Sequence, residues 1–137
     1  MRSESEVTVL VQKFLAALRE HAALMDVRIP AIRLKFDCPI AEESYLGDQR
    51  FVAHAFHQGN TIICLVARGI GRLTPHKMFG VIAHEVGHIM SNVQDDSAEG
   101  AADQWMRERL GIEIYYDSTD SLEFLDEKTL MSLGVRP

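Results

Sequence analysis

The sequence contains no long hydrophobic run, no internal repeat and no low-complexity stretch. No segment approaches the roughly 20 consecutive apolar residues that a membrane-spanning helix needs, so we expect no contact with a membrane. Basic residues are in the minority, and the net charge of −6 argues against a protein that binds nucleic acid by bulk electrostatics. The acidic segment Met1–Glu6 does not resemble a secretion signal, and we expect none.

Cysteine is also scarce in this chain. Cys38 and Cys64 are the two present, and their spacing is unlike that of any zinc-binding pair. They could form at most one disulfide. We take them as reduced residues with a structural role, and we therefore predict a cytoplasmic location.

The overall composition is typical of a globular domain. Apolar residues make up 47% and charged residues 25% of the 137 residues, and this length is most simply explained by one domain with a real core. We predict a single domain over residues 1–137. Its core should span about residues 32–110, followed by a C-terminal tail over 111–137 of undefined role.

The N-terminal half contains a helix and a first strand by its hydrophobic pattern. Apolar residues recur at helical spacing over about 3–25, and Ser3 with Glu6 offers a capping box at the helix start. Ile32–Phe36 alternates apolar and basic residues, which is the pattern of a strand with one solvent-exposed face.

A hairpin follows. Residues 50–57 and 61–67 flank Gln58-Gly59-Asn60, a sequence that favours a tight turn between two strands. The second arm is apolar on both faces, so we place it in the centre of a small sheet.

The second half of the chain is predicted to be mainly helical, from residues typical of helix starts and ends. Thr74 is an N-cap candidate, and the proline after it suits the first position of a helix over about 75–91. A second helix is expected over about 97–110, where a glycine ends it. A short strand over 112–116 and a last helix over 122–133 complete the prediction.

The feature that points to chemistry is the H-E-x-x-H motif formed by His84, Glu85 and His88. Residues four apart lie one turn apart on the same side of a helix, so both imidazoles can reach a single metal. Glu85 is then well placed to take a proton from a metal-bound water. The motif lies away from the apolar arc of its helix, and Gly80 and Gly87 beside it would let another helix come close.

The downstream helix contributes two acids on its apolar side. Glu99 and Asp103 lie on one stripe, and burying unpaired carboxylates costs several kcal/mol. A metal cation, or a histidine bound to one, would compensate the negative charge of both carboxylates. Separate explanations also exist, because Glu99 could complete a capping box with Asp96, and Asp103 could pair with Arg107.

The positions of the remaining histidines limit which residues can be metal ligands. No histidine follows His88, which excludes motifs that need a third histidine further along the chain. The upstream residues His21, His54, His57 and His76 are more typical of surface or hydrogen-bonded side chains than of ligands. Zinc held by two histidines and one carboxylate keeps a fourth position open, as in hydrolytic sites.

The segment AHEVGHIM at 83–90, followed by AEGAADQW at 98–105, resembles the ImmA/IrrE family of gluzincin metallopeptidases. That family pairs an H-E-[LIV]-G-H helix with a short turn and an E-x-x-A-D/N helix, after a small sheet. The resemblance covers about Ile32 to Leu110, and its helical motifs are specific whereas the strands match by pattern alone. It implies an α+β, zincin-like single domain with an N-terminal helix, three to four strands and two active-site helices.

The resemblance implies a role for each residue of the site. His84, His88 and Glu99 would bind Zn²⁺, although manganese, iron or cobalt could occupy such a site. Glu85 would be the general base, and Asp103 would accept a hydrogen bond from a ligand imidazole. The group that stabilises the oxyanion is left open among four candidates, which are Tyr115, Tyr116, His54 and His57.

The resemblance also implies a zinc-dependent endopeptidase that cleaves one regulatory protein, often a helix-turn-helix repressor. The tail after Leu110 is too short to hold such a domain, so the regulator would be a separate chain. The substrate would lie extended along a sheet edge, and the tail could be a docking arm, an inhibitory flap or a solvated helix. Two alternatives are a catalytically silent binding module that senses or sequesters a partner, and a purely structural zinc site.

Overall fold

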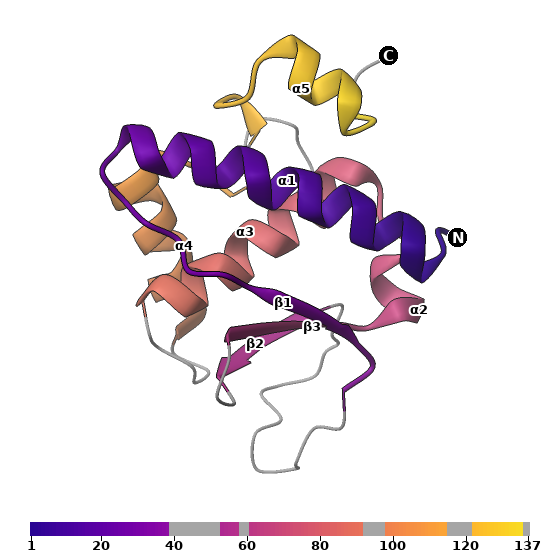
Figure 1. Cartoon of the computed structure of the whole chain (residues 1–137). Helices are drawn as coiled ribbons and strands as arrows, with labels where there is room; N and C mark the ends of the chain where they lie inside the picture. The colour runs from indigo at the N-terminus through magenta and orange to yellow at the C-terminus, as the bar shows by residue number, and fades with distance from the viewer. Residues whose placement is uncertain (39–52, 58–60, 92–97, 115–121, 136–137) are drawn as a thin grey trace.

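The computed structural model describes residues 1–38, 53–57, 61–91, 98–114 and 122–135, with the backbone alone at 54, 56, 57, 98 and 99. The fold is α+β (Figure 1). In chain order its elements are α1 (Glu4–Leu24), β1 (Arg33–Phe36), β2 (Ala53–His57), β3 (Thr61–Leu65), α2 (Ala67–Ile70), α3 (Pro75–Ser91), α4 (Ala98–Trp105), the π-helical turn η2 (Met106–Leu110) and α5 (Glu127–Ser132). None of the helices described here is both long and apolar enough to cross a bilayer.

The predicted capping box at the start of α1 is confirmed. The Glu6 amide donates to the Ser3 hydroxyl over 3.1 Å, and the Ser3 amide donates to the Glu6 carboxylate over 3.1 Å. The hydrogen bond from the Ser3 amide lowers the pKa of Glu6, because it stabilises the charged carboxylate. At the start of α5 the Thr129 amide lowers the pKa of Asp126 in the same way.

We expect both of these caps to weaken in acid. A carboxyl group with a pKa lowered by folding stabilises the folded state above its ordinary pKa, and the contribution is lost as the pH falls through the lowered value. The amide proton shifts of Ser3 and Thr129, followed by NMR during acid titration, should report these transitions below the ordinary pKa values. Glu6→Gln keeps an acceptor without a titrating proton, so it should abolish the transition at Ser3 and leave that at Thr129. A Ser3 transition that survives this variant would contradict the assignment.

The three strands form one mixed sheet in the order β1-β3-β2. β1 pairs with β3 in parallel, with Arg33 opposite Ile62, and β2 pairs with β3 in antiparallel, with Ala55 opposite Ile63. The central place predicted for the second hairpin arm is therefore confirmed. The hairpin turn at 58–60 and the strand residues 50–52 lie outside the described residues.

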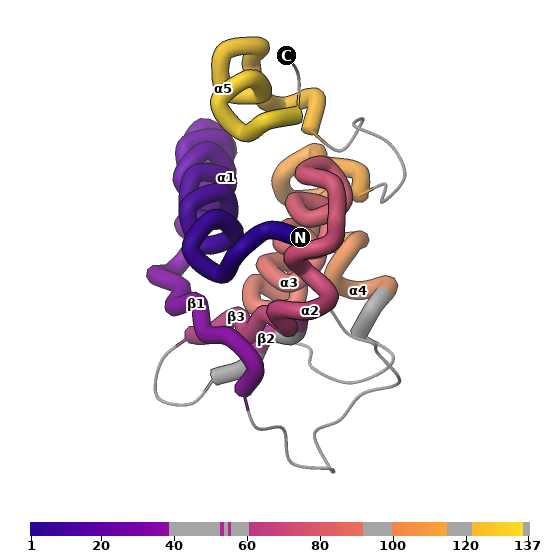
Figure 2. Tube along the Cα trace, turned by 90° about the vertical axis from the view of Figure 1, so that its right-hand side faces the viewer, coloured from indigo at the N-terminus to yellow at the C-terminus, as the bar shows by residue number. Residues whose placement is uncertain are grey.

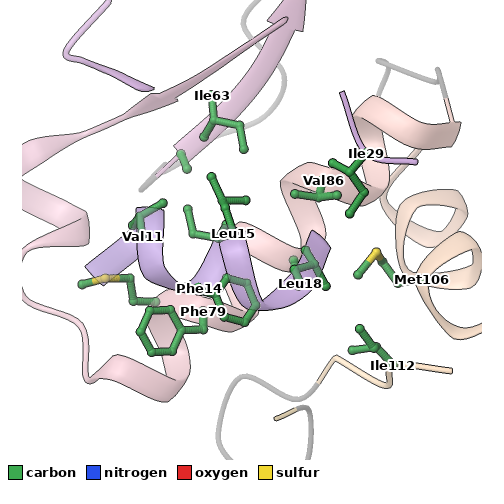
Figure 3. Packing of buried hydrophobic residues seen from close by; sticks show 14 of the residues in the cluster. Val11, Phe14, Leu15, Leu18, Ile29, Ile63, Phe79, Val86, Met106 and Ile112 are labelled. Atoms are coloured by element: carbon green, nitrogen blue, oxygen red, sulfur yellow. The ribbon is translucent and has the colours of Figure 1, made fainter. Parts of the chain in front are cut away.

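Helices α1 and α3 cover one face of this sheet, and α5 lies on the side of α1 that is remote from the sheet (Figures 1 and 2). Apolar side chains from the inner faces of α1, α3, α5 and the sheet meet in one core. Phe14 of α1 stacks on Phe79 of α3 with ring centroids 4.8 Å apart, and Leu15 faces Ile63 of β3 (Figure 3). This packing fixes α3, which carries the H-E-x-x-H motif, against both the sheet and α1.

The prediction of two reduced cysteines is wrong for this structure, where Cys38 and Cys64 form a disulfide. The pairing follows from strand register. Lys35 of β1 lies opposite Cys64 of β3, so the chain that leaves β1 brings Cys38 to the same end of the sheet. A separation of 26 residues in sequence gives no sign of this proximity.

Three element predictions need correction. Residues 112–114 are not in a strand, while 115–116 lie outside the described residues. The last helix begins at Glu127, where Asp126 caps it, and not at Leu122. The sequence also extended the strand before α2 through Ala67, which is instead the first residue of that one-turn helix.

The C-terminal tail is part of the domain. Leu122, Leu130 and Leu133 are almost fully buried in the core, and the Phe124 ring meets Phe14 edge-on with centroids 6.4 Å apart. Helix α5 is therefore a surface helix with one buried face, which it packs over α1 (Figure 2).

Candidate metal centre

Helix α3 presents an apolar face to the core and a polar group of residues to α4. As predicted, Pro75 is its first residue. Its apolar arc is buried against α1 and the sheet, and the residues of this arc with full burial include Met78, Phe79, Ile82 and Val86. The helix lies directly beside α4, which approaches the opposite side (Figure 2).

The three motif side chains are buried together. His84, Glu85 and His88 are only 7%, 5% and 6% exposed, and they are charged or polar groups in a largely apolar molecule. One ligand atom from each lies within 4.8 Å of the others. Buried polar and charged groups are generally hydrogen-bonded or bound to metal, and a divalent metal is a partner that all three side chains could share.

Asp103 of α4 fixes the orientation of the first histidine. Its Oδ1 atom lies 2.7 Å from Nδ1 of His84. A carboxylate can only accept a hydrogen bond, so Nδ1 of His84 is the donor. In the neutral imidazole the opposite nitrogen, Nε2, then carries a lone pair available to a metal. The predicted contact between Asp103 and a motif imidazole is thus present.

The two histidines turn these nitrogens toward each other. Nε2 of His88 lies 3.0 Å from Nε2 of His84, and the ring planes are perpendicular at 89°. Two nitrogens bound to one tetrahedral zinc at 2.0–2.1 Å would be about 3.3 Å apart. The pair is therefore already near the spacing of two ligands, although a direct hydrogen bond from a protonated His88 Nε2 explains the same distance. The donor set fits a divalent metal.

The predicted third ligand cannot be placed. The side chain of Glu99 lies outside the described residues, as does Asp96, its alternative capping partner. Asp103 is less buried than the sequence suggested, with 38% of its side chain exposed, because it sits at the margin of the contact between α3 and α4. Arg107, its alternative partner, has its Nε atom 3.9 Å from the Glu113 carboxylate.

The other histidines were expected to be surface or hydrogen-bonded residues, and the two with described side chains are. Nε2 of His21 lies 2.7 Å from the Leu110 carbonyl, and Nδ1 of His76 lies 3.3 Å from the Thr74 hydroxyl. The four candidates for oxyanion stabilisation, His54, His57, Tyr115 and Tyr116, have side chains outside the described residues.

The structure assigns a specific contact to Gly87, beside which the sequence predicted a close approach of another helix. A Cβ atom built on Gly87 would lie 2.5 Å from the Ala102 carbonyl oxygen, so the backbones of α3 and α4 touch at this point. Gly87 was expected to allow a close helix, but its contact could not be assigned from the motif. The partner in this contact, Ala102, is fully buried one position before Asp103.

Comparisons with protein-family models, with curated proteins and with solved structures found no match to this chain.

Proposed function

We propose that this protein is a zinc-dependent metallopeptidase that cleaves a specific protein substrate. The observation that supports this best is the convergence of the His84 and His88 Nε2 atoms at 3.0 Å, with His84 oriented by Asp103 through its other nitrogen. Metal-binding histidines generally donate their second N–H to a carboxylate or carbonyl in this way. The likeness to the ImmA/IrrE family in sequence motifs, including its zincin-like architecture, belongs to the same proposal.

Zinc is the favoured metal because the converging donors are imidazole nitrogens. We propose Glu99 as the third ligand. Its backbone is in α4 four residues before Asp103, and residues four apart lie on one side of a helix. Two histidines and one carboxylate leave a coordination position open for chemistry.

When bound, zinc supplies Lewis acidity and makes water acidic enough to lose a proton near neutral pH. Glu85 is the residue that handles this proton. Glu85 is 5% exposed and its carboxylate lies beside both imidazoles, so it can accept a proton from water and later donate it to the leaving amine of the peptide. The surrounding burial limits competing solvent and strengthens these electrostatic contacts.

The substrate is proposed to bind as an added strand beside β2. Among the described strands, β2 is bonded to β3 on one side and to none on the other, and it lies next to α3. An extended peptide there would use backbone hydrogen bonds for affinity. The family likeness suggests a regulator supplied as a separate chain, such as a helix-turn-helix repressor.

The replacement Glu85→Gln tests this function. We expect cleavage of a helix-turn-helix regulator encoded beside this protein to fall by about 10²- to 10⁴-fold, because general acid–base catalysis contributes that much. Zinc content, measured by elemental analysis after dialysis, should stay unchanged. Cleavage is followed by electrophoresis and mass spectrometry of the products.

Glu108→Gln on the exposed side of η2 is the matched control, and it should cleave like the unchanged protein. A regulator that binds the zinc-loaded protein without being cut would favour the binding module over the peptidase. Equal cleavage by Glu85→Gln would exclude Glu85 as the proton carrier.

The cellular location is tied to the cysteines. A cytoplasmic location stays part of the proposal, but glutathione and thioredoxin keep most cytoplasmic thiols reduced. A cytoplasmic enzyme should therefore carry Cys38 and Cys64 as thiols, whereas the disulfide present in this structure suits an oxidising compartment.

A further inference from the structure

The contact between α3 and α4 depends on the absence of one side chain. A Cβ atom at Gly87 would lie 2.5 Å from the carbonyl oxygen of Ala102, 2.9 Å from its carbonyl carbon and 3.1 Å from its Cβ atom. Real Cβ atoms essentially never come within 3.0 Å of such neighbours. The obstacle is backbone, which cannot rotate away as the end of a flexible side chain can.

This contact is adjacent to the candidate metal centre on both helices. Gly87 immediately precedes His88 on α3, and Ala102 immediately precedes Asp103 on α4. Asp103 in turn holds Nδ1 of His84 at 2.7 Å. The spacing of the two backbones therefore sets whether the carboxylate of α4 can reach the imidazole of α3.

We infer that Gly87 is a positioning residue that sets the distance between the metal-binding histidines of α3 and the carboxylates of α4. Any side chain at 87 must push α4 away by about half an ångström or more. A displacement of that size along the Asp103–His84 contact would stretch it to about 3.2 Å, the outer limit of a good hydrogen bond. Binding sites generally tolerate errors of only about 0.5 Å in their ligands.

The consequence for zinc rests on the proposed function, whereas the consequence for the hydrogen bond does not. Loss of a carboxylate that orients a metal-binding histidine typically lowers metal affinity by about 10- to 100-fold. If Gly87 served packing alone, a substitution would lower stability while the His84 ring stayed hydrogen-bonded to Asp103.

The experiment compares Gly87→Ala with Gly100→Ala. Gly100 lies in α4 itself, and a Cβ atom there meets nothing within 4 Å. Two quantities are measured: the NMR resonance of the His84 Nδ1 proton in the zinc-free protein, and the zinc dissociation constant from competition with a chelating dye. For Gly87→Ala we expect loss of the downfield proton resonance and zinc affinity weaker by about 10- to 100-fold. Gly100→Ala should keep both.

Coupling to Asp103 separates positioning from packing. In an Asp103→Ala background, which already lacks the carboxylate, Gly87→Ala should weaken zinc binding by a much smaller factor than it does alone. Equal factors in both backgrounds would mean that Gly87 does not act through Asp103. Ala102→Gly should not rescue Gly87→Ala, because removing the methyl group leaves the 2.5 Å contact with the carbonyl oxygen in place.

If Gly87→Ala does not fold, Ala102→Ser enlarges a fully buried side chain beside the same contact, and the displacement of α4 that it causes should also remove the His84 resonance. A folded variant of either kind that retains the resonance would overturn the inference. If the resonance is lost as expected but neither the unchanged protein nor Gly100→Ala binds zinc, the positioning role stands and the proposed function fails.

Discussion

Zinc added to the metal-free protein is expected to raise its unfolding temperature by roughly 10 °C. A ligand at about 100 times its dissociation constant stabilises the folded state by about 2.7 kcal/mol when it binds that state alone. In a domain of this size each kcal/mol corresponds to a few degrees. His88→Ala removes one of the two converging nitrogens, so its unfolding temperature should hardly respond to zinc. Thermal unfolding followed by circular dichroism, with and without chelator, measures the effect.

The fold itself should survive chelation. The apolar core joins α1, α3, the sheet and the C-terminal tail, and none of the residues described in it is a histidine or carboxylate that could bind a metal. His76→Ala, at the exposed start of α3, serves as a control that should respond to zinc like the unchanged protein. Unfolding on addition of chelator would instead identify a structural zinc, as in small domains that fold only with metal.

The elements that could be predicted from sequence are those defined by neighbouring residues. The start of α1 is encoded by Ser3 and Glu6 within four residues of each other, and α3 begins at Pro75 as its sequence indicates. The central place of β3 was predictable because its residues are apolar on both faces. Each of these signals acts locally, so no knowledge of the tertiary structure was needed.

Features that depend on packing between distant segments were missed. The Cys38–Cys64 pairing follows from the register of β1 and β3, and the burial of Leu122, Leu130 and Leu133 follows from the contact of the tail with α1. Neither relation is visible as a spacing along the chain. The π-helical turn at the end of α4 was also absent from the prediction, since its residues have ordinary helical propensity.

The same distinction between local and tertiary features holds for the candidate site. The spacing of His84, Glu85 and His88 on one helix places them together, and the sequence alone was enough to predict it. Asp103 was expected to accept a hydrogen bond from a motif imidazole, and its 2.7 Å contact with His84 agrees, but its 38% exposure did not follow from the apolar stripe. The distance between α3 and α4 is set by Gly87 and Ala102, a tertiary contact that the motif only hints at.

Reducing the Cys38–Cys64 bond is expected to lower the free energy of unfolding by about 3.5 kcal/mol, which is a large share of the roughly 5–15 kcal/mol typical of a domain. The bond joins residues 26 positions apart, and closing a loop of this length removes much conformational freedom from the unfolded chain. Urea unfolding with and without dithiothreitol should show a lower midpoint under reducing conditions. The difference between the two midpoints should be nearly the same when zinc is absent throughout.

Cys38→Ser is the variant that isolates the bond, because Cys38 is only partly buried whereas Cys64 is fully buried in the sheet and its truncation would also leave a cavity. This variant should unfold near the midpoint of the reduced protein, since the remaining thiol packs as a small apolar group. Its midpoint should not change with dithiothreitol. Two free thiols titrated in the denatured, unreduced protein would show that the bond is absent from the purified molecule. That outcome would favour the cytoplasmic location, whereas a disulfide that persists in the purified protein would favour a compartment where disulfides are stable.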